Sequence, residues 1–556
     1  MMMLLNPLHL TVAKLLQGRL FRIPDYQRSY SWQQRQRADL FADIWEAHRS
    51  GREHFMATLV ALARERRVID ADEFGVVELV DGQQRVTTLV ILLKALEKAL
   101  SDEKSDGRIK TELGTLLVKG DEHNLVLLQT NHDSSDIFAE YVRNGKVKSS
   151  AVKTASDRNL VDAIADCERF VEEWQVSASA ADLVFTVRNR LSMIYHELGD
   201  ESTVYRVFEV LNSRGLDVRW IDKTKSQLMA SIYEHVEDDG SRAEGLREMQ
   251  SVWKDIYRSL GLDERLGDEA LRFAGTWVRE TQANRILSDE DASVEMIRHA
   301  GSKLKTIVAA AIWLKTVVGK VIELNRDQRR AAVTRIAHAR FLAIAIMLRE
   351  FDEATEQRLL GAWERVTFRI FTLAGKDTRT KVGDYVRLGY EILANEPSAD
   401  SIESSLAELG DGYAIDEVIF EDSWDNWYEG WLEEVRYVLY RYEEYVAREE
   451  GVKINQSEWA KVWAVDPARS VEHIMPQSSG KSYVHNLGNL AMLPPRVNSS
   501  LKDKPPKDKA ARYVESGLRA TMKVGRDIEG GLRWNREAVL ERAARIEAFV
   551  RKEWAD

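Results

Sequence analysis

The sequence predicts a mostly helical α+β fold, with an α/β domain at its N-terminal end and a small ββα domain at its C-terminal end. Two observations are apolar strand-like runs at residues 54–63, 76–80 and 486–493, and between them amphipathic helical patterns joined by short polar loops. The third is length, because 556 residues exceed what one hydrophobic core usually organises. We therefore expect three domains, at residues 1–235, 236–455 and 456–556.

Composition excludes several classes of protein. The single cysteine, Cys167, excludes intrachain disulfides and cysteine-based zinc sites, and it is typical of a reducing cytoplasm, where we expect the protein to reside. No apolar run approaches the ~20 residues that span a bilayer, so we expect no membrane association. The net charge of −11 argues against indiscriminate nucleic-acid binding. It leaves DNA open, because residues 502–526 are locally basic while residues 411–450 are acidic.

The N-terminal region reads as alternating turns, helices and strands. Residues 101–150 are polar and predict loop and short helix. The remaining expectations are a proline turn with an aromatic segment at 21–32, a helix at 33–47, buried strands at 54–63 and 76–80, a helix at 84–100, and a helical segment at 158–200 that ends in a strand at 191–198.

The rest of the chain predicts helices and then a change of character. One helix is expected to end at the turn Asn212–Gly215, and the next is expected to be capped by Asp222. Residues 240–450 predict a long helical block. After it come a turn at EHIMP, a strand-like run NLGNLAML and a basic helical tail, which together predict the ββα domain.

The most informative C-terminal stretch is SVEHIMPQSSGKSYVHNLGNLAMLPPRVNSSLKDK, residues 470–504. Glu472 and His473 precede a proline turn, and Asn489 and Asn498 follow at a spacing that leaves room for two strands and the start of a helix. A carboxylate and an amide oxygen are ligands that Mg²⁺ prefers, and a neutral imidazole can take a proton from water. Taken one at a time, each of these residues is more typical of a polar turn.

In order, the blocks EHIMPQ, LGNLAML and RVNSSL resemble the HNH (ββα-metal) nucleases of the DUF1524 type. The resemblance implies that His473 is the general base, that Glu472 and Asn498 hold Mg²⁺ or Mn²⁺, and that Asn489 braces the loop carrying the catalytic histidine. His485 is more typical of a packing or capping residue. Four lysines after the last block could hold DNA phosphates: Lys502, Lys504, Lys507 and Lys509.

A second motif, VDGQQRVTTLV at residues 80–90, places polar residues where a strand becomes a helix. Gly82 at such a turn would expose the free amides of a helix N-terminus, which bind phosphate. Arg85 adds a fixed positive fork, and Asp81 could hold Mg²⁺ or a ribose hydroxyl. The alternative is that Asp81 caps the helix and Arg85 makes a structural ion pair.

The segments IPDYQRSYSW (23–32), DGQQRVTTL (81–89) and VFEVLNSRGLDVRWIDKTKSQLM (207–229) resemble the DUF262 family, which is ParB-like. Paired with DUF1524, that family forms the GmrSD-type, modification-dependent (type IV) restriction enzymes. The resemblance implies binding and hydrolysis of a nucleoside triphosphate (GTP, UTP or ATP) at Asp81, Gly82, Gln83, Gln84, Arg85 and Thr87. It also implies a set of residues that senses DNA: Tyr26, Gln27, Arg28, Asn212, Arg214, Asp222 and Lys225.

The expected function is therefore an anti-phage endonuclease that senses modified DNA and is regulated by a nucleotide. The expected DNA is phosphorothioated, or carries methyl, hydroxymethyl or glucosyl groups. Cutting both strands with one nuclease domain would require a homo-oligomer or two successive nicks. Two alternatives stay open: a ParB-like, nucleotide-switched DNA-binding protein with an inactive HNH end, and an HNH nuclease without modification sensing.

Overall fold

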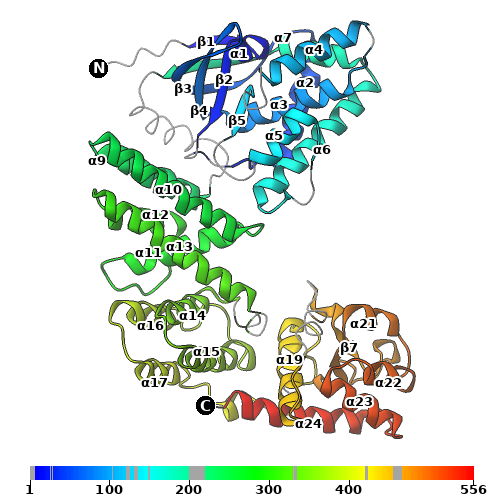
Figure 1. Ribbon diagram of the computed structural model, residues 1–556. Coiled ribbons are helices and arrows are strands. Elements are labelled where there is room, and N and C mark those ends of the chain that lie inside the picture. Colours follow the sequence, from blue (N-terminus) through cyan, green and yellow to red (C-terminus); the bar gives the residue numbers. More distant parts are fainter. Residues whose placement is uncertain are drawn as a thin grey trace. The chain divides into compact units, whose positions relative to one another are not determined.

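The computed structural model describes residues 7–24, 27, 29–102, 104–119, 125–129, 135–147, 151–198, 219–327, 330, 333, 335–419, 424–454, 462 and 466–555. These residues form two compact units. One unit comprises residues up to Val278 together with Leu287–Gly319, and the other comprises Arg279–Ile286 together with residues from Lys320 onward. The predicted division into three domains stays a prediction. Most described residues are helical (Figure 1), which confirms the mostly helical α+β class.

The first unit contains a mixed sheet that, among the described residues, has the strand order β1-β6-β3-β4-β2-β5. Strands β4, β2 and β5 run parallel to one another, whereas β1 with β6 and β3 with β4 are antiparallel. The elements are β1 (Leu8–Thr11), α1 (Val12–Leu16), β2 (Arg19–Ile23), α2 (Gln34–Ser50), β3 (His54–Ile69), β4 (Asp72–Asp81), α3 (Gln83–Ala99), α4 (Lys104–Leu117), β5 (Leu127–Gln129), α5 (Ser135–Asn144), α6 (Ala155–Gln175), α7 (Ala180–Asn189) and β6 (Leu191–Leu198).

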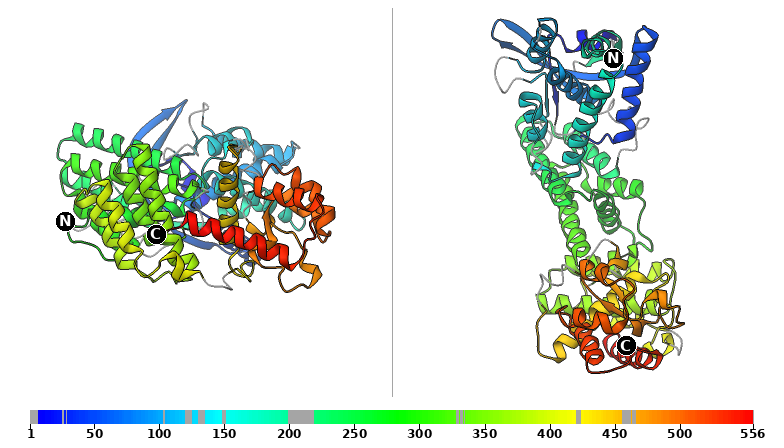
Figure 2. Two further views of the ribbon diagram at one scale, coloured as in Figure 1. Left: turned by 90° about the horizontal axis from the view of Figure 1, so that it is seen from below. Right: turned by 90° about the vertical axis from the view of Figure 1, so that its right-hand side faces the viewer.

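The helices α2 to α7 gather on one side of this sheet (Figure 1), because alternate strand residues supply one apolar face. Val77 and Leu79 of β4 point into that core, where α3 contributes a nearly continuous buried run. The predicted strands at 54–63, 76–80 and 191–198 are confirmed. Strands β3 and β4 continue past the prediction as a hairpin arm that extends beyond the sheet (Figure 2).

Two expectations for this unit were wrong. Residues 19–23 form the parallel strand β2, where the sequence had predicted only a turn. Residues 101–150 hold two helices of ordinary length, α4 and α5, as well as strand β5. Strands β2 and β5 are short, with five and three residues, so their sequences carry little periodicity of their own.

The middle of the chain is helical, as predicted. Helix α9 begins at Trp220 after Arg219, so Asp222 lies inside the first turn and is not its cap. The elements are α9 (Trp220–His235), α10 (Asp239–Leu260), α11 (Arg265–Val278), α12 (Asp289–Ala300), α13 (Leu304–Arg326), α14 (Ala337–Leu348), α15 (Glu353–Phe368) with a π-helical continuation (Arg369–Leu373), α16 (Val382–Ala394), α17 (Ala399–Leu409), α18 (Ile415–Val418) and α19 (Leu432–Glu449).

The C-terminal elements follow the predicted order of two strands and a helix. Strand β7 (Val471–His473) pairs antiparallel with β8 (Leu490–Met492), and α21 (Pro495–Leu501) follows. Single 3₁₀ turns lie at Pro467–Arg469, Gln477–Ser479 and Leu487–Asn489. The unit ends with α22 (Pro506–Val514), α23 (Arg519–Glu529) and α24 (Arg536–Glu553). Within the described residues, no helix combines the length and the apolar character needed to cross a membrane.

Candidate functional site

The C-terminal site is built around His473, the last residue of β7. Its ring is buried, with 7% of the residue exposed. The Gln477 amide donates to His473 Nδ1 over 3.1 Å, and His473 Nε2 lies 3.3 Å from Nδ1 of His485. The ring edge of Tyr428 packs on His473 at 4.2 Å between centroids.

This environment keeps the imidazole neutral. Burial first, and then the nearby His485 and Lys509, lower the pKa of His473 to about 3. A neutral ring at pH 7 has one nitrogen with a lone pair and one that carries a proton. That lone pair can accept a proton from a bound group, although the lowered pKa makes the protonated ring less stable than a free imidazolium.

Glu472 lies on the other side of β7, because consecutive strand residues point to opposite faces. Its Oε1 accepts hydrogen bonds from Lys509 Nζ at 2.6 Å and from the Tyr513 hydroxyl at 2.9 Å, both on α22. Burial raises the pKa of the Glu472 carboxyl, and the Lys509 ammonium opposes that rise. The acid and the histidine that are adjacent in sequence thus have separate partners.

The predicted metal ligands Glu472 and Asn498 each have partners within the protein. Glu472 Oε1 is paired with the Lys509 ammonium. The amide nitrogen of Asn498 donates to the carbonyl oxygens of Arg469 and Val471 at 3.1 Å each. Among the residues that the structure describes, no group of three or more His, Cys, Asp or Glu side chains could hold a metal ion. Binding of Mg²⁺ or Mn²⁺ by Glu472 and Asn498 stays a prediction.

Asn489 is completely buried and holds the loop between the strands, in the way the sequence led us to expect. Its Oδ1 accepts from the Met475 amide at 2.8 Å and from Trp534 Nε1 at 2.9 Å, and its Nδ2 donates to the Met475 and Val484 carbonyl oxygens. Because every polar atom of this side chain is used by the protein, Asn489 positions the loop and does not contact a substrate.

The turn before Asn489 is fixed by helix α24. A Cβ on Gly488 would lie 2.0 Å from the Val539 carbonyl oxygen, so only glycine fits there. The Arg542 guanidinium, also on α24, donates to the carbonyl oxygens of Gly488 and Leu490. The segment before α19 adds a second support, because Asn486 donates to Asp425 at 2.8 Å and Leu487 N donates to Trp424 O at 3.0 Å.

Of the four predicted phosphate-binding lysines, Lys509 was wrong. It is 1% exposed and bound to Glu472 and to the His473 carbonyl oxygen, because burial of the glutamate requires a nearby cation. Lys502, Lys504 and Lys507 are exposed, as a phosphate contact requires.

The N-terminal candidate residues meet at the junction of β4 and α3. Gly82 has φ of 90° and opens the first turn of α3, where a Cβ would lie 2.4 Å from Leu59 Cδ1. Arg85 is half-buried over the Trp32 ring. Burial lowers the pKa of its guanidinium, and the negative charge of Asp81 partly offsets this effect. The free amides of this turn and Arg85 are the groups that could hold a phosphate.

The amide side chains at this junction have a different role from the predicted one. Gln84 is buried, accepts from the Ser31 amide at 2.8 Å and donates to the Ser29 carbonyl oxygen at 3.1 Å. Gln27, predicted to sense DNA, is also buried and donates to the Val80 carbonyl oxygen at 2.8 Å. Gln83 and Thr87 are buried as well. The two motifs thus bind each other, which the sequence did not predict.

Asp222 and Lys225 were also expected to sense DNA, but both are buried among α9, α10 and α11. Asp222 accepts from the Tyr257 hydroxyl at 2.5 Å and pairs with Arg219 at 3.1 Å, and the Lys225 ammonium lies over the Tyr257 ring. They stabilise helix packing and present no group to DNA. Tyr26, Arg28, Asn212 and Arg214 lie outside the described residues.

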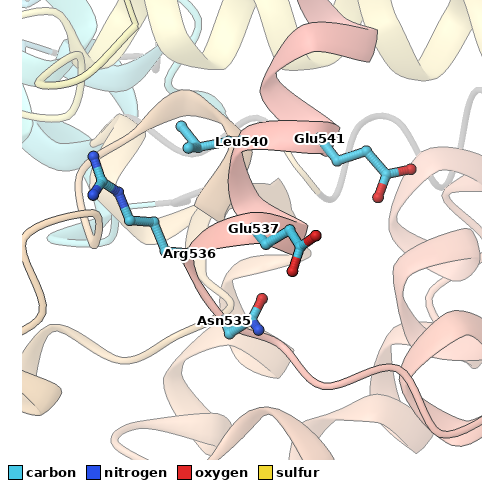
Figure 3. Close-up of a pocket in the computed structure, with 5 residues that line it drawn as sticks. All are labelled: Asn535, Arg536, Glu537, Leu540 and Glu541. Carbon is cyan, nitrogen blue, oxygen red and sulfur yellow. The ribbon is translucent and has the colours of Figure 1, made fainter.

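A surface hollow at the start of α24 is shown in Figure 3. Its lining side chains are all exposed, and Arg536 and Glu541 point to opposite sides of the helix while Glu537 lies near Asn535. They provide no convergent polar set, in contrast to the groups around His473. The lining residues are Asn535, Arg536, Glu537, Leu540 and Glu541.

Sequence reasoning missed four members of the His473 site, one of which is Gln477 on the loop after β7. His485, Tyr428 and Glu429 contact the site from a loop and from the segment before α19. The alternation of aromatic and acidic residues at 424–431 was the available signal, and it reads equally as core and solvated surface.

Comparison with known proteins adds family membership to this geometry. Residues 12–229 match the GmrSD restriction endonuclease N-terminal domain, and residues 414–548 match the GmrSD restriction endonuclease C-terminal domain. A search among curated proteins found no match. The second match begins before α18 and so includes the Trp424–Glu429 segment that supports the His473 site. With both characteristic domains present in order, the chain belongs to the GmrSD restriction endonuclease family.

Proposed function

We propose that the chain is a type IV, modification-dependent DNA endonuclease in which His473 takes a proton from the attacking water. The observation that carries this proposal is a buried, neutral imidazole at the end of β7, in a β–β–α order, on a loop fixed by Asn489. This is the position of the general base in the HNH nucleases that the sequence resembles. Three exposed lysines after α21 and at the start of α22 supply phosphate contacts.

The proposed step is hydrolysis of one phosphodiester bond. The water oxygen forms a bond to phosphorus, one of the two bonds from phosphorus to sugar oxygen breaks, and the water proton moves to His473. The leaving sugar oxygen takes a proton from solvent. Proton transfer to a positioned base contributes typically about 10²–10⁴-fold to such a reaction.

No part of this step is routed through a metal, because Glu472 is paired with Lys509 in the structure. Dependence on Mg²⁺ or Mn²⁺ stays a prediction that removal by EDTA and re-addition of the ion would test.

We propose that a nucleoside triphosphate binds at the β4–α3 junction through the first-turn amides of α3 and Arg85. A half-buried guanidinium beside a helix N-terminus, opened by Gly82, supports the proposal. The DNA-sensing role is correspondingly assigned to the same unit, which holds the matched N-terminal domain.

The test is cleavage of DNA by the full chain and by His473→Ala. We expect the variant to lose about 10²-fold or more of the cleavage rate, the contribution of a general base. His299→Ala, which removes an exposed histidine of α12, should cleave like the wild type. Unchanged cleavage by His473→Ala would reject the assignment.

A further inference from the structure

His485 lies against the proposed catalytic histidine without an assigned role. Its Nδ1 faces His473 Nε2 at 3.3 Å, and its Nε2 lies 3.5 Å from a carboxylate oxygen of Glu429. Its ring is stacked on Tyr428, with the planes 16° apart. Gln477, His473, His485 and Glu429 therefore form a continuous chain of polar contacts.

The chain has a direction. The Gln477 amide nitrogen can only donate, so His473 Nδ1 is the acceptor and carries the lone pair. The proton of neutral His473 is then on Nε2, and it is donated to His485 Nδ1. The proton of His485 is consequently on Nε2, where it faces the Glu429 carboxylate.

The reverse direction is disfavoured. If the Gln477 amide were turned to accept from His473 Nδ1, His485 would have to donate from Nδ1. Its Nε2 lone pair would then face the negative charge of Glu429. The carboxylate thus selects one of the two arrangements, just as an acid orients the imidazole in a nucleophile–histidine–acid triad.

We propose that His485, oriented by Glu429, is a positioning residue that fixes the tautomer of His473. Nδ1 of His473 is then the atom that receives the proton from water, a role that rests on the proposed function. Gln477 occupies the place beside Nδ1 that the attacking water takes during the reaction. The supports of this loop are consistent with such a role, because Asn486 and Leu487, directly after His485, are tied to Asp425 and Trp424.

The first measurement locates the ring proton of His473 and does not depend on DNA cleavage. The full chain is labelled with ¹⁵N-histidine, and two-bond ¹H–¹⁵N correlations identify which ring nitrogen of His473 carries hydrogen; His473→Ala assigns the signals. We expect a pyrrole-type Nε2 and a pyridine-type Nδ1 in the wild type. A proton on Nδ1 of His473 in the wild type would overturn the inference, whatever the protein does to DNA.

The second measurement uses variants. His485→Phe keeps a ring for Tyr428 but removes the acceptor for the His473 proton. We therefore expect His473 to exchange between its two neutral tautomers. We also expect kcat to fall about 10²-fold and KM to change less than about threefold. His485→Asn, whose Oδ1 can still accept, should recover most of kcat. Glu429→Ala should shift the tautomer, whereas Glu541→Ala, an exposed acid of α24, should not.

A His485→Phe enzyme with wild-type kcat and an unchanged His473 spectrum would overturn the positioning role. The proposed function fails by a separate result, namely cleavage that persists in His473→Ala. If His485→Phe did not fold, the wild-type spectrum and Glu429→Ala would still decide the inference.

Discussion

Lys509 and Glu472 form the most buried ion pair around the candidate site. Their side chains are 1% and 5% exposed, and the Tyr513 hydroxyl is the second donor to the same carboxylate oxygen. A buried pair of this kind adds little net stability, yet removal of one partner leaves an uncompensated charge in the interior. The pair therefore constrains which substitutions the site tolerates.

We predict that Lys509→Met lowers the free energy of unfolding by about 3–5 kcal/mol, the cost of leaving one charge of a buried pair without its partner. Urea denaturation measures it. Lys507→Met, on the same helix but exposed, should change stability by less than about 0.5 kcal/mol. The double variant Glu472→Gln/Lys509→Met should recover much of the loss, and equal losses in the single and double variants would contradict the ion-pair explanation.

At the scale of elements, the β4–α3 junction connects the apolar core of the sheet to the proposed nucleotide site. Strand β4 ends at Asp81, and α3 begins at Gln83, so Gly82 alone makes the turn. Gln84 from α3 and Gln27 bind backbone groups of the neighbouring segments. A change at the turn would therefore move both the helix and the segment that packs on it.

Gly82→Ala is predicted to destabilise the protein by about 2–4 kcal/mol. Positive φ costs a side chain of order 1–3 kcal/mol, and a methyl group forced against buried Leu59 adds overpacking. Gly18→Ala is the matched control, because Gly18 has φ of 67° and no atom within 4 Å of the added carbon. Gly18→Ala should lose only the stability that the unfavourable backbone conformation costs. Equal losses of stability for the two variants would contradict the contribution of overpacking against Leu59.

At the scale of the whole molecule, two matched domains of one chain lie in two compact units. The N-terminal unit holds the proposed nucleotide junction, and the other unit holds His473. Regulation of cleavage by nucleotide or by DNA modification would thus require coupling between units. Such coupling is a difference in free energy that a ligand of one unit must supply.

The full chain should discriminate among DNA substrates. We predict that one modified class, among phosphorothioated, methylated and glucosylated hydroxymethylated DNA, is cleaved at least about tenfold faster than unmodified DNA, a difference of about 1.4 kcal/mol. ATP, GTP or UTP should change that rate, and Arg85→Ala should remove the nucleotide effect. Gel separation of nicked and linear plasmid measures both.

Equal cleavage of all substrates would favour a nuclease without modification sensing. Nucleotide-dependent DNA binding without any cleavage would favour a ParB-like protein with an inactive nuclease end. Because the same samples give all three readings, one experiment separates the three functions that the sequence left open.

The sequence by itself determined the family, the order of two strands and a helix around His473, and the turn at Gly82. These features are local: a motif, an apolar alternation or a glycine acts over a few residues, and neighbouring positions are enough to specify it. The bracing role of Asn489 was implied by the resemblance to HNH nucleases, and its side chain contacts both ends of the loop segment between β7 and β8 through Met475 and Val484.

Only the tertiary structure decided which of the predicted polar residues are exposed to a ligand and which are bound by other residues of the protein. Lys509, Asp222 and Lys225 looked like ligand-binding residues, yet each is buried beside partners from other elements of the fold. His485 looked like packing, yet it faces His473. The physical reason is that the environment of a charged or polar group depends on groups brought together from distant segments, and no short pattern in the chain encodes those partners.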